Sequence, residues 1–221
     1  MNNYEFNNYV ELVGTITKES IFSHSVGEEN FYETEIAVAR LSGERDFIPL
    51  LVAEKDLNLV QEGARAYIHG QYRSYNKFEN NKSRLLLTVF CKNIIDGNSF
   101  YEEKDLSRDF NKIVLSGFIC KPPIYRKTPL NREITDVLIA VNRNYSKSDY
   151  VPIIAWGKDA LDLSTRNVGD PLTFEGRIQS REYTKRYENG EQEIRTAYEV
   201  SITRLSNENC DANAINFMSV K

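Results

Sequence analysis

Two stretches of similar sequence decide the fold: NYVELVGTI at residues 8–16 and NKIVLSGFI at residues 111–119. In the first, Val10, Leu12 and Ile16 alternate with other residues, which is typical of a half-buried β-strand. The two stretches lie 103 residues apart, and the same spacing relates IAVAR at 36–40 to IAVNR at 139–143 and FIPLL at 47–51 to YVPII at 150–154.

The spacing then grows toward the end of the repeat. Gly70 matches Gly176 at a spacing of 106, and residues 87–89 match residues 198–200 at a spacing of 111. A spacing that holds across several strands and grows in loops indicates a duplication with loop insertions. A repeat of this length is a domain rather than a solenoid unit.

Each copy is predicted to consist mostly of β-strands. One short helical stretch interrupts it, at 55–62 in the first copy and at 158–167 in the second, and a glycine follows each. A long hairpin comes next, most clearly at 173–202, where Asn189 and Gly190 favour a tight turn. Three strands, a helix and a two-stranded return is the order of a five-stranded oligonucleotide-binding (OB) barrel.

The predicted fold class is therefore all-β, with two tandem five-stranded OB-fold barrels. Each barrel is expected to have a short helix between its third and fourth strands. We expect a first OB domain at 1–104, a second at 105–206 and a short C-terminal tail at 207–221.

Composition narrows the class of protein further. The 221 residues are 41% apolar and 27% charged, as in soluble globular proteins, and no run of 18 apolar residues suggests a membrane span. The first residues lack a secretory signal, and three widely spaced cysteines favour a reducing compartment, so we expect a cytoplasmic, nucleoid-associated protein.

The charge is unevenly distributed along the chain. Residues 1–104 contain 11 Lys and Arg against 16 Asp and Glu, whereas residues 105–221 contain 17 Lys and Arg against 16 Asp and Glu. Any phosphate-binding surface is therefore expected as a local stripe in the second half.

Residues 111–206 resemble the bacterial single-stranded DNA-binding proteins, and residues 8–95 follow the same plan more loosely. The resemblance includes a glycine-marked first strand at 114–117, the aromatic-Gly-Lys motif at 156–158, and EGRIQSR at 175–181. It implies a duplicated OB barrel that binds single strands without a cofactor or a metal.

The resemblance also implies which aromatic residues stack on bases, which present a π-face whatever their sequence. Three positions match the family clearly: Trp156, Tyr150 six residues before it, and Tyr183 seven residues after Gly176. Tyr125 and Tyr187 are further candidates, and Tyr145 matches only loosely. The alternative is that these aromatics are simply good strand formers with one buried face.

Basic residues interleave with these aromatics and are the candidate phosphate contacts. They are Lys121, Arg126, Lys127, Arg143, Lys158, Arg177 and Arg181. Because several acids lie near the hairpin, a solvated face of mixed charge is the alternative interpretation there.

The first copy departs from this pattern. Ala53 stands where the second copy has Trp156, and Lys77 stands where it has Tyr183, although Phe47 matches Tyr150. We therefore expect the first barrel to have a degenerate DNA-binding face. The tail at 207–221 also lacks the acidic tip that recruits partners in the family.

These observations predict sequence-independent binding of single-stranded DNA in replication, recombination or repair. The family's need for four barrels implies a homodimer, and replication or repair proteins are candidate partners. The alternative is an OB-fold adaptor of a replication or mobile-element complex that binds DNA weakly. An enzyme is not expected, because the chain has only two histidines and no phosphate-cradling loop, nucleophile elbow or metal-ligand spacing.

Overall fold

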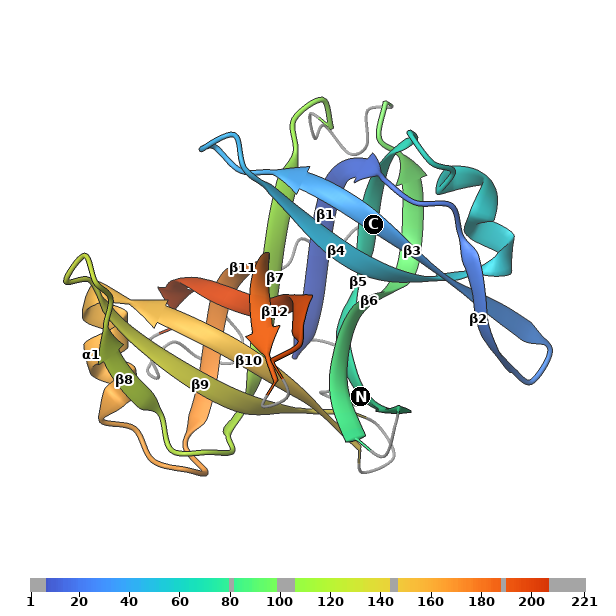
Figure 1. Cartoon of the computed structure of the whole chain (residues 1–221). Coiled ribbons are helices and arrows are strands. Elements are labelled where there is room, and N and C mark those ends of the chain that lie inside the picture. Colours follow the sequence, from blue (N-terminus) through green and yellow to red (C-terminus); the bar gives the residue numbers. More distant parts are fainter. Residues whose placement is uncertain (1–6, 80–81, 99–105, 144–146, 188–189, 207–221) are drawn as a thin grey trace, which may run out of the picture.

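A computed structural model describes residues 7–79, 82–98, 106–143, 147–187 and 190–206. They form two barrels side by side, with β1–β6 in the first and β7–β12 in the second (Figure 1). In this part of the chain, no helix has the length and apolarity needed to cross a membrane.

The first barrel closes through five of its strands. Its elements are β1 (Asn8–Ile16), β2 (Ile21–Val26), β3 (Glu29–Ala39), β4 (Arg45–Ala53), a 3-10 helix (Glu54–Leu59), β5 (Arg65–Glu79) and β6 (Lys82–Asp96). Strand β1 pairs with β3 and β5, β3 with β4, and β5 with β6, all antiparallel, and a parallel pairing of β4 with β6 closes the ring. Strand β2 lies outside the ring, and within the described residues it pairs only with β3.

The second barrel repeats this plan. Its elements are β7 (Phe110–Ile119), β8 (Ile124–Lys127), β9 (Glu133–Asn142), β10 (Ser148–Trp156), α1 (Gly157–Ser164), β11 (Pro171–Arg186) and β12 (Gln192–Leu205). The parallel pairing that closes the ring joins Leu50 to Val89 in the first barrel and Ile153 to Val200 in the second. These residue pairs have the spacings of 103 and 111 that the sequence predicted.

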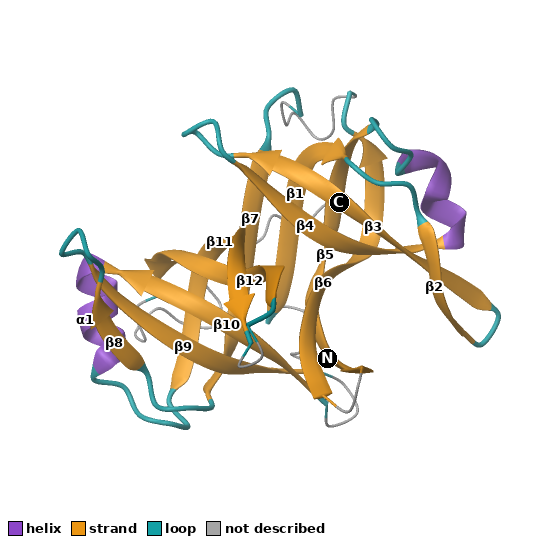
Figure 2. Ribbon diagram, in the orientation of Figure 1, coloured by secondary structure: helices purple, strands orange, loops and turns teal. Residues whose placement is uncertain are grey.

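The OB-fold prediction is confirmed, with two differences. Each barrel has an additional outer strand, β2 or β8, that was not predicted from the sequence. The helix after the third barrel strand is also shorter than expected, and in the first barrel it is a 3-10 helix. Figure 2 shows both helices at opposite ends of the molecule, away from the junction of the barrels.

Matched glycines occur where each hairpin bends over its barrel. A Cβ atom at Gly176 would lie 2.6 Å from the carbonyl oxygen of Ser201, and one at Gly70 would overlap the carbonyl oxygen of Phe90. Both positions adjoin register shifts in the β5–β6 and β11–β12 ladders. Only glycine permits this close approach of two backbones.

The barrels are joined through β1 and β7, which pair antiparallel from Asn8–Leu115 to Val13–Phe110. The described strands therefore form one twelve-stranded sheet, with β2 and β8 at its two edges. The main cluster of buried apolar side chains includes residues of both barrels.

A pair of buried aspartates fixes the barrels to each other. Asp46 accepts a 2.9 Å hydrogen bond from the backbone N–H of Ser180, while the N–H of Phe47 donates to the Ser180 hydroxyl at 2.8 Å. Asp149 and Tyr150 make the same two contacts with Ser74, at 2.5 and 2.7 Å. Each aspartate thus contacts the opposite barrel. Because the two sets of contacts match, the two barrels are related by an approximate twofold symmetry.

Candidate nucleic-acid interface

Three exposed aromatics lie on the second barrel, at positions that the sequence predicted. Trp156 ends β10, is 40% exposed, and donates from its indole Nε1 to the Ser201 hydroxyl on β12 at 3.2 Å. Tyr150 on the same strand and Tyr183 on β11 are 45% and 39% exposed. A large aromatic held at its edge while much of its surface stays in water is suited to stacking on a base.

The two further tyrosine candidates have different surroundings. Tyr125 on β8 is 38% exposed, and its hydroxyl donates to Glu133 at 3.1 Å. The Tyr187 ring already has cations over it, with Lys185 at 5.0 Å and Arg195 at 6.0 Å from its centroid. A hydrogen bond to Glu193 is the main cause that raises the pKa of Tyr187. Tyr145 lies outside the described residues.

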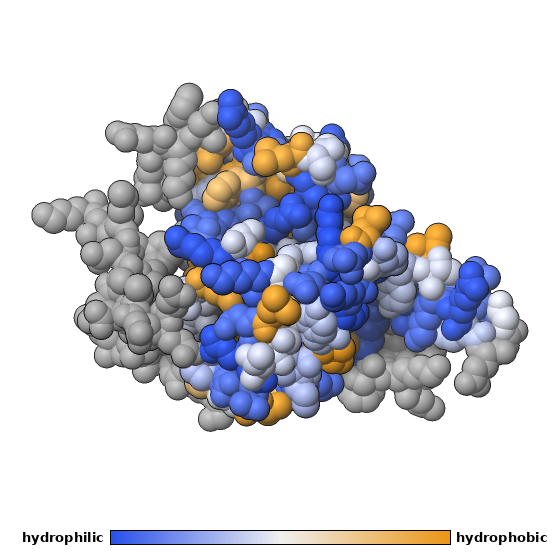
Figure 3. All heavy atoms as spheres, turned by 90° about the vertical axis from the view of Figure 1, so that its left-hand side faces the viewer, coloured by the Kyte–Doolittle hydropathy of each residue, from blue (hydrophilic) through white to orange (hydrophobic). Residues whose placement is uncertain are grey.

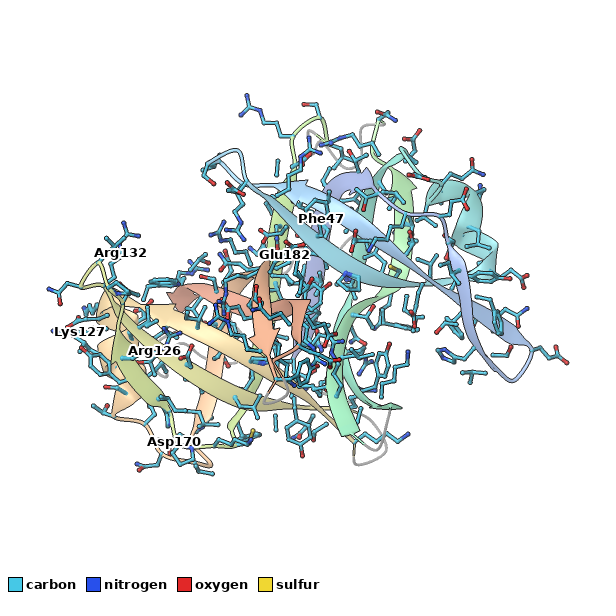
Figure 4. All side chains as sticks on the ribbon, viewed as in Figure 1. Phe47, Arg126, Lys127, Arg132, Asp170 and Glu182 are labelled. Atoms are coloured by element: carbon cyan, nitrogen blue, oxygen red, sulfur yellow. The ribbon has the colours of Figure 1, made fainter. Side chains whose placement is uncertain are left out.

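Several candidate cations gather at the outer end of the second barrel. Figure 4 shows Arg126, Lys127 and Arg132 together, on β8 and on the turn that follows it. Arg126 donates to both carboxylate oxygens of Asp136, at 2.7 and 3.2 Å, and Lys127 lies 3.9 Å from Glu133. These pairs are largely exposed, so a phosphate can compete for the cations at low cost. Seen from this side, the described surface is mostly hydrophilic, with hydrophobic residues singly or in small groups (Figure 3).

The remaining candidate cations are distributed along the same barrel. Lys121, Lys158 and Arg181 are exposed, whereas Arg177 is half-buried beside the Gln179 side chain. Arg143 is different, because it donates to buried Asp149 at 2.5 Å and to the Ser74 carbonyl of the first barrel at 2.8 Å. Arg143 therefore connects the two barrels in the structure. Its contact with a phosphate stays a prediction.

A carboxylate lies among these cations. Glu199 is half-buried on β12, two residues before Ser201 and therefore on the same side of the strand. Burial is the main cause that raises the pKa of Glu199, and it outweighs the opposing effect of Arg181, Arg126 and Arg40. This acid was not singled out in the sequence, because only the folded barrel places it beside the aromatics.

Sequence reasoning also missed a groove of about 650 Å³ on the first barrel. Its lining residues from that barrel are Ser23, His24, Glu33, Leu51, Arg73, Ser74, Tyr75, Thr88 and Phe90, and the second barrel adds Arg143 and Lys147. Residues from both copies meet there, and neither copy's sequence predicts such a site by itself. Figure 4 shows Phe47 and Glu182 at the other crossing of the barrels, where β11 approaches β4.

Known proteins of two kinds resemble this chain. Residues 110–206 match the model of the Single-strand binding protein family. Single-stranded DNA-binding protein 2 of Streptococcus agalactiae serotype V is 28% identical over 83 residues, which are 34% of this chain and 63% of that protein. The chain thus spans less than two thirds of the length of this relative.

A second kind of relative covers most of the chain. The single-stranded DNA-binding protein of Thermus aquaticus is 23% identical over 217 residues, or 87% of this chain and 81% of that protein. The crystal structure of its wild-type form has a TM-score of 0.63, with 21% identity and coverage of 92% of this chain and 94% of that one. This likeness shows a common fold. The second barrel, residues 110–206, thus matches the single-strand binding protein family, and the two-barrel chain as a whole shares the fold of the Thermus aquaticus protein.

Proposed function

We propose that this protein binds single-stranded DNA with little sequence preference and covers single strands exposed in replication, recombination or repair. The observation that supports this most is Trp156, an exposed indole anchored by Ser201 on a barrel of the single-strand binding family. Bases stack on Trp156, Tyr150 and Tyr183, and each stack contributes about 1–3 kcal/mol. Proteins of this family bind DNA and are not enzymes, so the proposal includes no reaction.

Phosphate contacts supply the second part of the affinity. We assign them to the exposed basic residues of the second barrel, together with the half-buried Arg177. These are Lys121, Arg126, Lys127, Lys158, Arg177 and Arg181. We also propose that two chains form a homodimer, which provides four barrels. The molar mass of the protein in solution, measured by light scattering, tests this.

Trp156 provides the test, because it is the only tryptophan in the chain. Oligo-dT should quench its fluorescence, and Trp156→Ala should weaken binding by about 1–3 kcal/mol. Trp156→Phe is the matched control, since it keeps a stacking ring, and it should lose less affinity. Unchanged emission at a DNA concentration that saturates binding would show that Trp156 has a purely structural role.

A protein-docking function is the second candidate, and strand β2 favours it. Ile21, Phe22 and Val26 are 71%, 55% and 62% exposed on an open edge of the sheet. Exposed apolar residues on an unpaired edge are typical of surfaces that bind other chains. An adaptor that binds DNA weakly would show negligible affinity for oligo-dT at moderate salt.

A further inference from the structure

The two barrels place an aromatic at equivalent sites from different strands. In the second barrel, Trp156 of β10 lies over Ser201 of β12. The parallel ladders pair Ile154 with Ser201 and Leu51 with Phe90, so Phe90 is the equivalent of Ser201. The first barrel therefore has Ala53 in place of the tryptophan and a phenylalanine in place of the serine beneath it.

Phe90 forms part of a small aromatic platform. Its ring packs on Phe31 at a centroid distance of 5.8 Å, and Phe31 in turn stacks on His24 at 5.4 Å. Tyr75, 42% exposed, lines the groove together with Phe90. The loss of the tryptophan from the first copy is thus offset by an aromatic on the neighbouring strand.

Positive charge lies along the side of this groove that faces the second barrel. Arg73 is 3.2 Å from Asp149, which is fully buried and also paired with Arg143. The single negative charge of Asp149 therefore balances only one of the two positive charges of Arg73 and Arg143. The exposed Lys147 adds a further positive charge. Glu33 lies across the groove and accepts hydrogen bonds from Ser23 at 2.8 Å and Tyr75 at 3.4 Å.

Among the positions equivalent to Arg73, Arg143 and Lys147, only Arg40, the counterpart of Arg143, is basic. The ladders match Arg73 with Gln179 and Thr88 with Glu199. Lys147 matches Glu44, because the N–H of Arg143 donates to the Lys147 carbonyl just as that of Arg40 donates to the Glu44 carbonyl. Arg73 and Lys147 are therefore the cations specific to the groove of the first barrel.

We propose that this groove is a second site for an unpaired nucleotide of the DNA strand, built from both barrels. The base stacks on Phe90 beside Tyr75, and a flanking phosphate binds Arg73, Arg143 and Lys147. A volume of about 650 Å³ is sufficient for one nucleotide. This inference rests on the proposed function, and it gives the first barrel a binding role that the sequence alone did not predict.

A relocated tryptophan in the full chain tests the site. In a Trp156→Phe background, Phe90→Trp makes the groove the only source of tryptophan fluorescence. Oligo-dT should quench this emission, and the quenching should saturate together with the anisotropy of a labelled oligonucleotide. Phe22→Trp in the same background is the control, since Phe22 packs on Tyr32, outside the groove, and its emission should stay unchanged.

A charge variant gives an independent measurement. Lys147→Ala, at an exposed position that should not disturb folding, should weaken binding several-fold and reduce the steepness of the salt dependence by about 0.7. Lys147→Arg keeps the contact and should bind like the wild-type chain.

The two proposals can fail separately. If the wild-type chain binds oligo-dT but the fluorescence of the Phe90→Trp variant does not change, the groove is not a binding site and the proposed function stands. If the wild-type chain does not bind, both proposals are wrong.

Discussion

At the scale of single residues, the proposed interface combines aromatics that the sequence identifies with charges that only the fold brings together. Trp156, Tyr150 and Tyr183 follow from family spacing, because their motifs are local. Phe90 could not be found in this way, since a position-by-position comparison of the two copies matches it with a serine. Its role follows from the pairing of β4 with β6, two strands that are distant in sequence.

Glu199 leads to a prediction at this scale. Its ionised carboxylate repels a phosphate on the same face, and burial raises its pKa, so acidification protonates it earlier than an ordinary glutamate. Affinity for oligo-dT should therefore rise as the pH falls from about 7.5 to about 5, by up to about fivefold for a repulsion of about 1 kcal/mol. Titrations at both values measure it.

Glu199→Gln separates this acid from the other acids near it on the second barrel, which include Asp136. The variant should bind more tightly than the wild type at the higher pH and should show a weaker pH dependence. An unchanged pH dependence in Glu199→Gln would show that other groups cause it.

At the scale of elements, the sequence predicted the five barrel strands of each copy and missed two short ones. Strand β8 has four residues, and β2 has exposed apolar side chains, so neither shows the alternation of a half-buried strand. Both form because they pair with the longer β3 and β9, which is a tertiary effect. The constant spacing of the repeat was the strongest signal, since it does not depend on local propensity.

The hairpin glycine Gly176 provides a prediction about these elements. Gly176→Ala places a Cβ 2.6 Å from a backbone oxygen, so the β11–β12 hairpin must shift, and stability should fall by at least about 3 kcal/mol. Gly27→Ala is the matched control, because its φ is +61° but nothing lies within 4 Å, and it should cost about 1 kcal/mol. Urea unfolding measures both, and equal losses would contradict the close-approach argument.

At the scale of the whole molecule, the two barrels act as one unit because β1 pairs with β7 and buried aspartates cross the junction. The sequence predicted two domains with separate roles. In the structure, residues such as Arg143, which repeats Arg40, contact the opposite barrel and join the two. Such a junction is invisible in either copy, because its partners lie in the other one.

Asp149→Asn should destabilise the whole chain. It leaves Arg73 and Arg143 without their shared buried counter-charge, and the loss should be about 3 kcal/mol, as for other broken buried pairs. Asp162→Asn removes an exposed pair with Arg166 and should cost less than about 0.5 kcal/mol. Denaturant midpoints distinguish the two, and a small effect of Asp149→Asn would contradict the junction described above.

The salt dependence of oligo-dT binding by the full chain tests the central claim most directly. The chain has a net charge of −4, so DNA binding requires a local basic surface. With about four to six phosphate contacts at about −0.7 each, log affinity should fall with log salt at a slope near −3 to −4. A slope near zero, or no binding at any salt concentration, would contradict the claim and would favour the adaptor function.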